Sequence, residues 1–220
     1  VGRAGKASYA EGESMKRLYL LRHGQTEFNV KKLVQGRCDS PLTGLGRQQA
    51  RVAAAWLKAH NVVPDKVVSS PLGRAMDTAQ LVATELLGPD AAVEPCEGII
   101  ERCYGTFEEG PHDALPTDVW DPGEDLVPFG GEGSRALQER MVDTLTNIMG
   151  ADGIETLLAV SHGSASRQFI KAAAPEGFEL PTKLPNCAIM IFDFEDSQEE
   201  CDTSQCKFTL QQIIDPQQSL

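Results

Sequence analysis

The chain has 220 residues, which is enough for one α/β domain or a domain with a small lid. Its 32 acidic residues outnumber 20 Lys and Arg, and the resulting net charge of −12 disfavours a nucleic-acid or anionic-membrane binder, because both need a basic face. No stretch approaches the roughly 18 apolar residues of a membrane span. Six cysteines without framework spacing and the lack of a signal-peptide pattern lead us to expect reduced thiols in a cytoplasmic protein.

Short apolar runs alternate with helical patterns along the chain. Residues 1–14 are small, polar and aperiodic, which predicts a disordered leader before a single domain over residues 15–220. The strands are expected at 18–21, 66–69, 93–95, 156–161, 188–194 and 208–214. The helices are expected at 43–60, 71–87, 134–149 and 164–173. Such alternation predicts a mostly parallel sheet covered on both faces, closed by an antiparallel C-terminal hairpin.

The segment 105–133 has a different composition. It holds four prolines, six glycines and eight acidic residues, but no Lys or Arg. Long loops in compact domains are usually functional or mobile, so we expect an irregular acidic lid here.

Basic residues and His-Gly pairs cluster after three of the expected strands. These residues are Arg22, His23, Gly24, Arg74, His162 and Gly163. The carboxyl ends of parallel strands meet at one edge of a sheet, so we expect these residues to converge there. The arginine fork matches two phosphoryl oxygens, glycines admit an anion close to the backbone, and the helix N-terminus near Ser164 offers unpaired N–H groups. With imidazole as nucleophile, the pattern predicts phosphoryl transfer without a metal or other cofactor.

Five stretches occur in an order that resembles the histidine phosphatase superfamily, in its phosphoglycerate-mutase-like group. They are LLRHGQTEFN, QGRCDSPLTGLGRQQA, SSPLGRAMDTA, ERCYG and SHG. The resemblance covers residues 16–214 and implies a three-layer α/β/α sandwich. It further implies the site residues, which are a phosphohistidine-forming His23, a proton-donating Glu101, a catalytic His162 in the phosphate pocket, and phosphate ligands at Arg22, Asn29 and Arg74. Gly163, beside His162, is added as a phosphate-binding residue because a glycine admits an anion close to the backbone.

Some assignments have alternatives. Glu97, Glu108 and Glu109 lie near Glu101, and any of them could be the acid or a solvated surface residue. The pair Gln35-Gly36 matches a family stretch at the pocket rim, but it is equally a turn former.

The two remaining histidines are given structural roles. His60 stands at an expected helix end and is interpreted as a surface or capping residue. His112 lies in the lid, where a solvated loop histidine is favoured over a substrate contact.

Three functions compete on this evidence. A phosphomonoesterase acting on a small phosphorylated metabolite is favoured, because a lid rich in acids and free of Lys and Arg should repel a second anionic group. The alternative is a cofactor-dependent phosphoglycerate mutase, although Tyr104 lacks the arginine pair that follows it in mutases. A non-catalytic phosphate-binding module needs neither a nucleophile nor a proton donor, so it is disfavoured. No oligomeric state is predicted.

Overall fold

The computed structural model describes residues 15–195 and 207–218. The predicted leader and nearly all of the acidic turn at 195–205 lie outside them. A six-stranded sheet has the order β3-β2-β4-β1-β5-β6. The first four strands in this order run parallel to one another. Strand β5 runs antiparallel to β1 and forms an antiparallel hairpin with β6, as predicted. The strands are β1 (Lys16–Arg22), β2 (Lys66–Ser69), β3 (Glu94–Pro95), β4 (Thr156–Ser161), β5 (Ile189–Phe194) and β6 (Phe208–Ile214).

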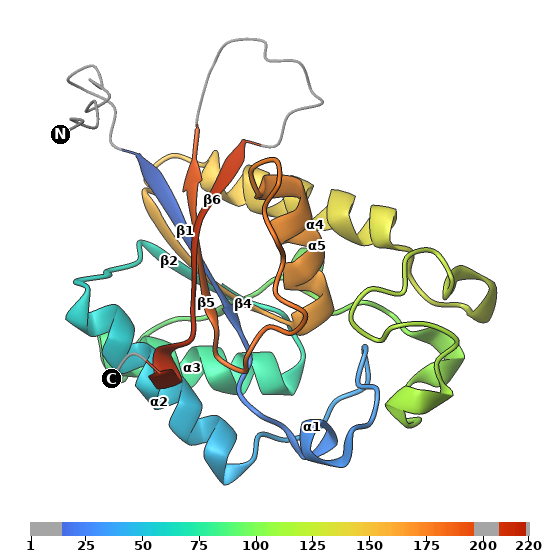
Figure 1. Ribbon diagram of the computed structural model, residues 1–220. Helices are drawn as coiled ribbons and strands as arrows, with labels where there is room; N and C mark the ends of the chain where they lie inside the picture. The colour runs from blue at the N-terminus through green and yellow to red at the C-terminus, as the bar shows by residue number, and fades with distance from the viewer. Residues whose placement is uncertain (1–14, 196–206, 219–220) are drawn as a thin grey trace, which may run out of the picture.

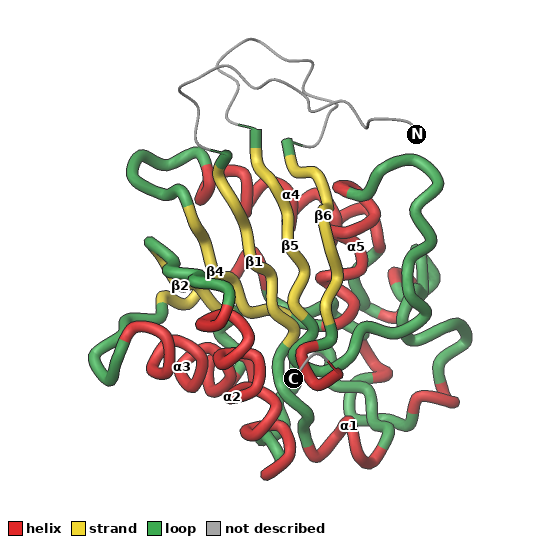
Figure 2. The backbone as a smooth tube through the Cα atoms, turned by 60° about the vertical axis from the view of Figure 1, so that its left-hand side comes forward, coloured by secondary structure: helices red, strands yellow, loops and turns green. Residues whose placement is uncertain are grey.

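Helices cover both faces of this sheet (Figures 1 and 2). One pair, α2 and α3, packs on one face, and the other pair, α4 and α5, packs on the opposite face. The predicted three-layer α/β/α sandwich is therefore confirmed. The helices are α1 (Glu27–Lys31), α2 (Gly44–Ala59), α3 (Gly73–Leu87), α4 (Ser134–Met149) and α5 (Gly163–Ala173).

The apolar run in β1 serves both layers. Leu18 and Leu20 join the core beneath α4 and α5, whereas Leu21 and the partly buried Tyr19 join the core beneath α2 and α3. Successive side chains of a strand point to opposite faces, so a strand buried on both sides needs a continuous apolar run. The run places the end of β1 in the middle of the molecule.

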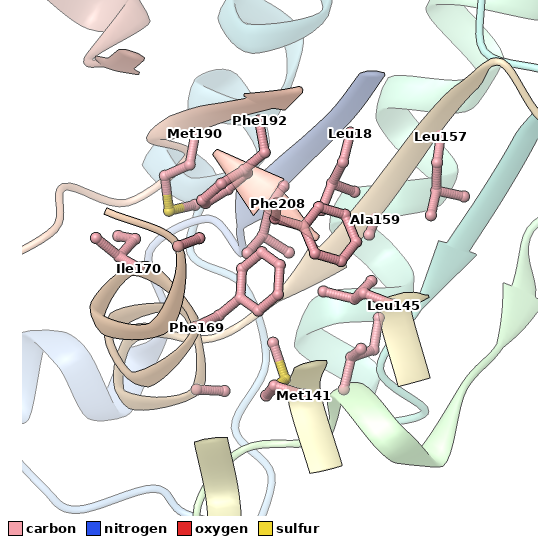
Figure 3. Packing of buried hydrophobic residues seen from close by; sticks show 14 of the residues in the cluster. Leu18, Met141, Leu145, Leu157, Ala159, Phe169, Ile170, Met190, Phe192 and Phe208 are labelled. Atoms are coloured by element: carbon pink, nitrogen blue, oxygen red, sulfur yellow. The ribbon is translucent and has the colours of Figure 1, made fainter. Parts of the chain in front are cut away.

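Three phenylalanines form the centre of the α4–α5 core (Figure 3). The Phe169 ring of α5 lies edge-on to Phe192 at 4.8 Å and to Phe208 at 5.0 Å between ring centroids. Such edge-to-face pairs add about 0.5–1.5 kcal/mol to the burial itself. These contacts hold α5 against the antiparallel hairpin of β5 and β6, and they thereby position the loop between β4 and α5.

Helix α1 was not predicted from the sequence. It has five residues and begins with a capping box, in which the Thr26 hydroxyl accepts from the Asn29 N–H and the Asn29 side chain accepts from the Thr26 N–H. A helix of one turn has no apolar periodicity to detect, and none of its residues is buried. It carries the chain from β1 toward the lid.

The lid is irregular, as expected, and consists of short 3₁₀ turns. They are η2 (Gly105–Phe107), η3 (His112–Ala114) and η4 (Val127–Phe129). A small separate core holds the lid against the chain after α1, through Val34, Tyr104, Leu115 and Leu126.

Both ends of the lid meet at one buried arginine. Arg102 donates from its guanidinium to the Glu132 carbonyl at 2.7 Å and to the Ser134 hydroxyl at 2.9 Å. The Glu132 N–H donates a hydrogen bond to the Cys103 carbonyl at 2.8 Å. Within the described residues, no helix is both long and apolar enough to cross a bilayer.

Candidate active site

The predicted strand-end residues converge on one cavity of about 230 Å³. It lies at the carboxyl edge of the parallel strands, where β1, α3 and α5 meet. Eight of the nine predicted site residues line it, namely Arg22, His23, Asn29, Gln35, Gly36, Arg74, Glu101 and Gly163. The ninth, His162, is not part of the lining, but its ring centroid lies 5.2 Å from that of His23. We call Arg22, His23, Arg74 and Glu101 the floor of the cavity.

His23 is held as a neutral imidazole with one open nitrogen. Its ring is 2% exposed, and Nδ1 lies 2.7 Å from the Gly24 carbonyl oxygen, so this nitrogen donates its proton and Nε2 keeps its lone pair. Burial lowers the pKa of His23 well below its ordinary value, and the nearby Arg74 and Arg22 lower that pKa further. The Nε2 atom is therefore available as a nucleophile near neutral pH.

The two floor arginines are bound to the protein through their guanidinium ends. Arg74 donates to the carbonyls of Cys38, at 2.8 Å, and Gly36, at 2.7 Å, and pairs with Asp39 at 3.1 Å. Arg22 donates to the Leu184 carbonyl. Burial lowers the pKa of Arg22 to about 10, although the nearby Glu101 acts to raise that pKa. The guanidinium therefore stays cationic at neutral pH.

Three buried nitrogens around His23 have no hydrogen-bond partner in the described structure: Arg22 Nε, Arg74 Nε and His162 Nδ1. The other ring nitrogen of His162 lies 2.7 Å from the Ser70 hydroxyl. Buried polar atoms are rarely left unpaired in folded proteins. Their grouping beside the nucleophile fits an anionic ligand.

Glu101 occupies the N-terminus of α5. Its Oε1 accepts from the N–H groups of Arg102, at 2.8 Å, and Ala165, at 2.9 Å, and its Oε2 accepts from Ser164 N–H at 3.2 Å. The expectation that the N–H groups near Ser164 stand unpaired is therefore wrong. A carboxylate from the segment just before the lid binds them instead.

The alternative acids lie elsewhere. Glu97, Glu108 and Glu109 are not among the residues that line the cavity. Glu108 accepts from the N–H groups of Arg37, Cys38 and Tyr104 at 2.9–3.0 Å, so it joins the lid to the loop that holds Arg74.

The two strand-end glycines have packing roles. A Cβ on Gly24 would collide with the backbone of Gly46 in α2, and a Cβ on Gly163 would lie 2.6 Å from the Trp120 ring. The absence of a Cβ on Gly24 therefore serves close packing between the end of β1 and α2. Gly163 packs closely under Trp120 and also lines the cavity, so its predicted role in admitting an anion stays a prediction.

The rim residues support one another. Asn29 Oδ1 accepts from Thr26 N–H at 3.1 Å and from Asn186 Nδ2 at 3.2 Å, and Gln35 bonds to the Thr26 hydroxyl at 3.0 Å. Gly36 has a φ of 55°, a left-handed conformation that favours glycine and turns its carbonyl to Arg74.

Sequence reasoning missed several lining residues. Lys183 and Asn186 precede β5, which is antiparallel, so its start lies at the edge where the parallel strands end. The signal that could have found them is the predicted antiparallel hairpin, because the residues before an antiparallel strand lie at the same edge as the residues after the parallel strands. Lys32 ends α1, and Trp120 comes from the lid.

The histidine interpretations have different outcomes. His60 caps α2 and stacks on Trp56 with 3.7 Å between ring centroids, as a capping residue should. His112 lines the cavity, is half-buried, and contacts the Leu33 carbonyl at 3.2 Å through Nε2, so its description as a solvated loop residue is wrong. We call Lys32, His112, Lys183 and Trp120 the mouth of the cavity.

The acids of the lid lie outside the lining of the cavity. Glu132 pairs with Arg140 of α4 at 2.7 Å, and Asp121 forms an ion pair with Lys171 of α5 at 2.5 Å. None of the eight acids lines the cavity. Two of these carboxylates are matched by cations on α4 and α5. The expected repulsion of a second anionic group by the lid stays a prediction.

Known proteins resemble this chain in sequence and in fold. A profile of the histidine phosphatase superfamily (branch 1) matches residues 18–207. The probable phosphoglycerate mutase GpmB of Escherichia fergusonii is 32% identical over 193 residues, which are 84% of this chain and 87% of the relative. The GpmB protein of Proteus mirabilis is also 32% identical, over 83% and 87% of the two chains.

Two solved structures extend the comparison. Phosphoserine phosphatase from Entamoeba histolytica in complex with phosphoserine has a TM-score of 0.69 at 27% identity, covering 93% of this chain and 99% of that one. Phosphoglycerate mutase from Bacillus anthracis has a TM-score of 0.72 at 22% identity, over 90% and 92%, which shows a shared fold. The chain is thus an enzyme of the phosphatase or mutase class. It belongs to the histidine phosphatase superfamily.

Proposed function

We propose that the protein is a phosphomonoesterase that hydrolyses small phosphorylated metabolites through a phosphohistidine at His23. The observation that carries this proposal is the set of unpartnered nitrogens of Arg22, Arg74 and His162 around the open Nε2 of His23. They provide hydrogen-bond donors and positive charge where a phosphoryl group must sit during transfer.

In the first step, Nε2 of His23 attacks phosphorus and the bond from phosphorus to the ester oxygen breaks. The departing alkoxide takes a proton from Glu101. The atom proposed to deliver it is Oε2, which accepts one hydrogen bond at 3.2 Å whereas Oε1 accepts two at 2.8 and 2.9 Å. In the second step, water attacks the phosphohistidine and gives its proton to the Glu101 carboxylate. Inorganic phosphate and neutral His23 result.

Hydrolysis is favoured over mutase chemistry by the contribution of the lid. The lid supplies His112, Val119 and Trp120 to the cavity, together with Tyr104 just before it, but no Lys or Arg. A mutase must retain a bisphosphorylated intermediate until the phosphoryl group returns, which calls for cations that close over it.

The mutase is the second candidate, and a specific observation favours it. Lys32 and Lys183 reach the same cavity from outside the lid, and the GpmB relatives are named as probable phosphoglycerate mutases.

One assay separates the two candidates. The purified enzyme is incubated with 3-phosphoglycerate, with and without 2,3-bisphosphoglycerate, and both inorganic phosphate and 2-phosphoglycerate are measured. We expect phosphate release from small monoesters, no stimulation by the bisphosphate, negligible 2-phosphoglycerate and no effect of EDTA. Efficient, bisphosphate-stimulated interconversion would favour the mutase and overturn the proposal.

A further inference from the structure

The loop that holds Arg74 lies between two opposite charges. On one side, the Arg74 guanidinium donates to the carbonyls of Gly36 and Cys38. On the other side, the half-buried Glu108 carboxylate accepts from the N–H groups of Arg37, at 3.0 Å, and Cys38, at 2.9 Å. The loop therefore connects a buried cation of the cavity floor to a carboxylate that does not line the cavity.

One peptide group of this loop contacts both charges. The group between Gly36 and Arg37 places its carbonyl oxygen 2.7 Å from Arg74 Nη2, and its nitrogen lies 3.0 Å from Glu108 Oε1. Hydrogen bonds in such a chain polarise one another, so an amide that donates to a carboxylate has a more negative carbonyl oxygen. That oxygen accepts more strongly from the guanidinium. Arg74 and Glu108 are therefore coupled through a single amide.

Gly36 gives the loop the shape that this contact needs. Its φ of 55° lies in the left-handed region, which favours glycine. A Cβ at this position would also collide with the Glu108 carboxylate. The loop is therefore folded closely around the carboxylate as well as bonded to it.

The bonds to the loop determine which atom of Arg74 is left for a ligand. Nη2 donates to the Gly36 carbonyl, and Nη1 donates to the Cys38 carbonyl and to Asp39 Oδ1. Nε is buried without a partner in the described structure. The guanidinium is planar, so fixing its two terminal nitrogens also fixes the direction of the Nε–H bond. A displaced loop would turn this donor away from the phosphoryl group.

The lid is attached to the chain after α1 by backbone hydrogen bonds that do not use this carboxylate. The Glu109 N–H donates to the Val34 carbonyl at 2.8 Å, and the Val34 N–H donates to the Gly110 carbonyl at 2.8 Å. An isolated bridge pairs Leu33 with Pro111. Loss of the carboxylate should therefore leave the lid attached and act on the loop that holds Arg74.

We infer that Glu108 is a positioning residue for Arg74. Its carboxylate holds the loop so that Arg74 presents Nε–H to a phosphoryl group at His23. The same carboxylate accepts from the Tyr104 N–H at 3.0 Å, so it also fixes the segment that carries Glu101 beside this loop. The inference rests on the proposed function for the role of Arg74 in phosphoryl transfer.

A double-mutant cycle tests whether Glu108 acts through Arg74. The value of kcat/KM for p-nitrophenyl phosphate is measured for Glu108→Gln, Arg74→Gln and the double variant. Gln keeps the size of the side chain but replaces one acceptor oxygen by an NH₂ group, so at least one of the three hydrogen bonds is lost. We expect Glu108→Gln to lower kcat/KM about three- to tenfold in the wild type and less than about 1.5-fold in Arg74→Gln. Equal factors in the two backgrounds would overturn the inference.

Gly36→Ala disturbs the same contact with Glu108 intact, because the added Cβ pushes the loop away from the carboxylate. It should also lower kcat/KM, and again by a much smaller factor in the Arg74→Gln background. A loss that is independent of Arg74 would contradict the inference, and this variant decides the question if Glu108→Gln does not fold.

The pH profile separates a displaced Arg74 from the lost charge of Glu108. Removing a carboxylate by itself lowers the pKa of a nearby histidine, whereas moving Arg74 away raises the pKa of His23. The charged and titratable side chains around His23 are Arg22, Arg74, Glu101 and His162. In Glu108→Gln the acid limb of kcat/KM should therefore move to higher pH. A limb that stays in place or moves to lower pH would overturn the positioning role.

Glu109→Gln is the matched control. It removes the same charge from the next residue, which is exposed and lies outside the lining of the cavity. This variant should keep both the wild-type kcat/KM and the wild-type pH profile. A loss as large as that of Glu108→Gln would show that the effect comes from the charge of the lid and not from the loop contact.

Binding of inorganic phosphate distinguishes a failure of this inference from a failure of the proposed function. Calorimetric titration should show that Glu108→Gln binds phosphate about threefold more weakly than the wild type, whereas Glu109→Gln binds it equally well. A wild-type enzyme that releases phosphate from no ester would overturn the proposed hydrolysis and leave this comparison standing. Unchanged phosphate affinity in Glu108→Gln would overturn the positioning role.

Discussion

The floor and the mouth of the cavity hold their charges in different ways. Arg22 and Arg74 of the floor are buried, and their guanidinium groups bond to backbone carbonyls, so each is fixed in place. Lys32 and Lys183 of the mouth are exposed and have no ion pair among the described residues. We expect the floor, which the sheet positions, to determine the reaction, and the mouth, which loops position, to determine which esters are accepted.

The strongest test of this division is the loss of the nucleophile. His23→Ala should reduce phosphate release on the order of 10⁴-fold or more, because the groups of a cooperating set act as a unit. The imidazole lines the cavity and belongs to neither hydrophobic core, so the thermal unfolding midpoint should stay near that of the wild type. A variant that keeps the wild-type rate would show that His23 is not the nucleophile.

The acid should matter for some substrates and not for others. Glu101→Gln should slow the hydrolysis of alkyl phosphates about 10²–10⁴-fold, because a poor leaving group needs the proton. Hydrolysis of p-nitrophenyl phosphate should fall far less, since nitrophenolate leaves without one. Glu97→Gln, at an exposed carboxylate outside the cavity, is the matched control and should slow neither substrate. Equal losses on both substrates with Glu101→Gln would remove Glu101 from this role.

The pH dependence reports the electrostatics of the floor. The depressed pKa of His23 keeps the imidazole neutral as the pH falls, so the acid limb of kcat/KM for p-nitrophenyl phosphate should lie below 6.5. Arg74→Gln removes a cation from beside His23, so the pKa of His23 should rise. The acid limb of the kcat/KM profile should therefore move to higher pH. A limb that stays in place in this variant would mean that another group controls it.

The smallest effect is expected at the mouth. The Arg22 guanidinium carbon lies 5.1 Å from the centre of the Trp120 ring, and Lys183 Nζ lies 5.9 Å from it. Trp120→Ala should raise KM about two- to fivefold, the size of a partly exposed cation–π contact, with a smaller change in kcat. Val127→Ala, at an exposed lid residue outside the cavity, should leave KM unchanged. A large loss of kcat in Trp120→Ala would show that this residue contributes to the reaction itself, as the floor residues do.

The fold was largely predictable because the sheet follows local patterns. The β1 run 18–21, the β4 strand and the apolar spacing of α2 and α3 were all recognised within a few residues of their observed bounds. The convergence of Arg22, His23, Arg74 and Gly163 followed from the rule that parallel strands end at one edge. The four residues lie on elements whose direction the sequence pattern determines.

The mouth was much harder to predict because its residues depend on loop conformation. Lys32 follows a one-turn helix, Trp120 lies in the irregular lid, and Lys183 belongs to a loop that two buried arginines hold. Composition alone also does not show that Glu132 and Asp121 of the lid pair with Arg140 and Lys171 on the adjacent helices. Neither the positions of the mouth residues nor the pairing of the lid acids produces a periodicity or a spacing that can be seen in a single sequence.

The meeting of the two lid ends at Arg102 has a consequence for how such enzymes diverge. Residues 104–131 leave and rejoin the fold at nearly the same point, where Glu132 bonds to Cys103. The entropy of closing a loop grows only slowly with its length. Descendants of this chain can therefore lengthen, shorten or exchange that segment while Glu101 and α4 keep their positions. Glu108 is the exception within this segment, because it binds the loop that holds Arg74. Changes elsewhere in the lid can alter the accepted substrates and leave the chemistry unchanged.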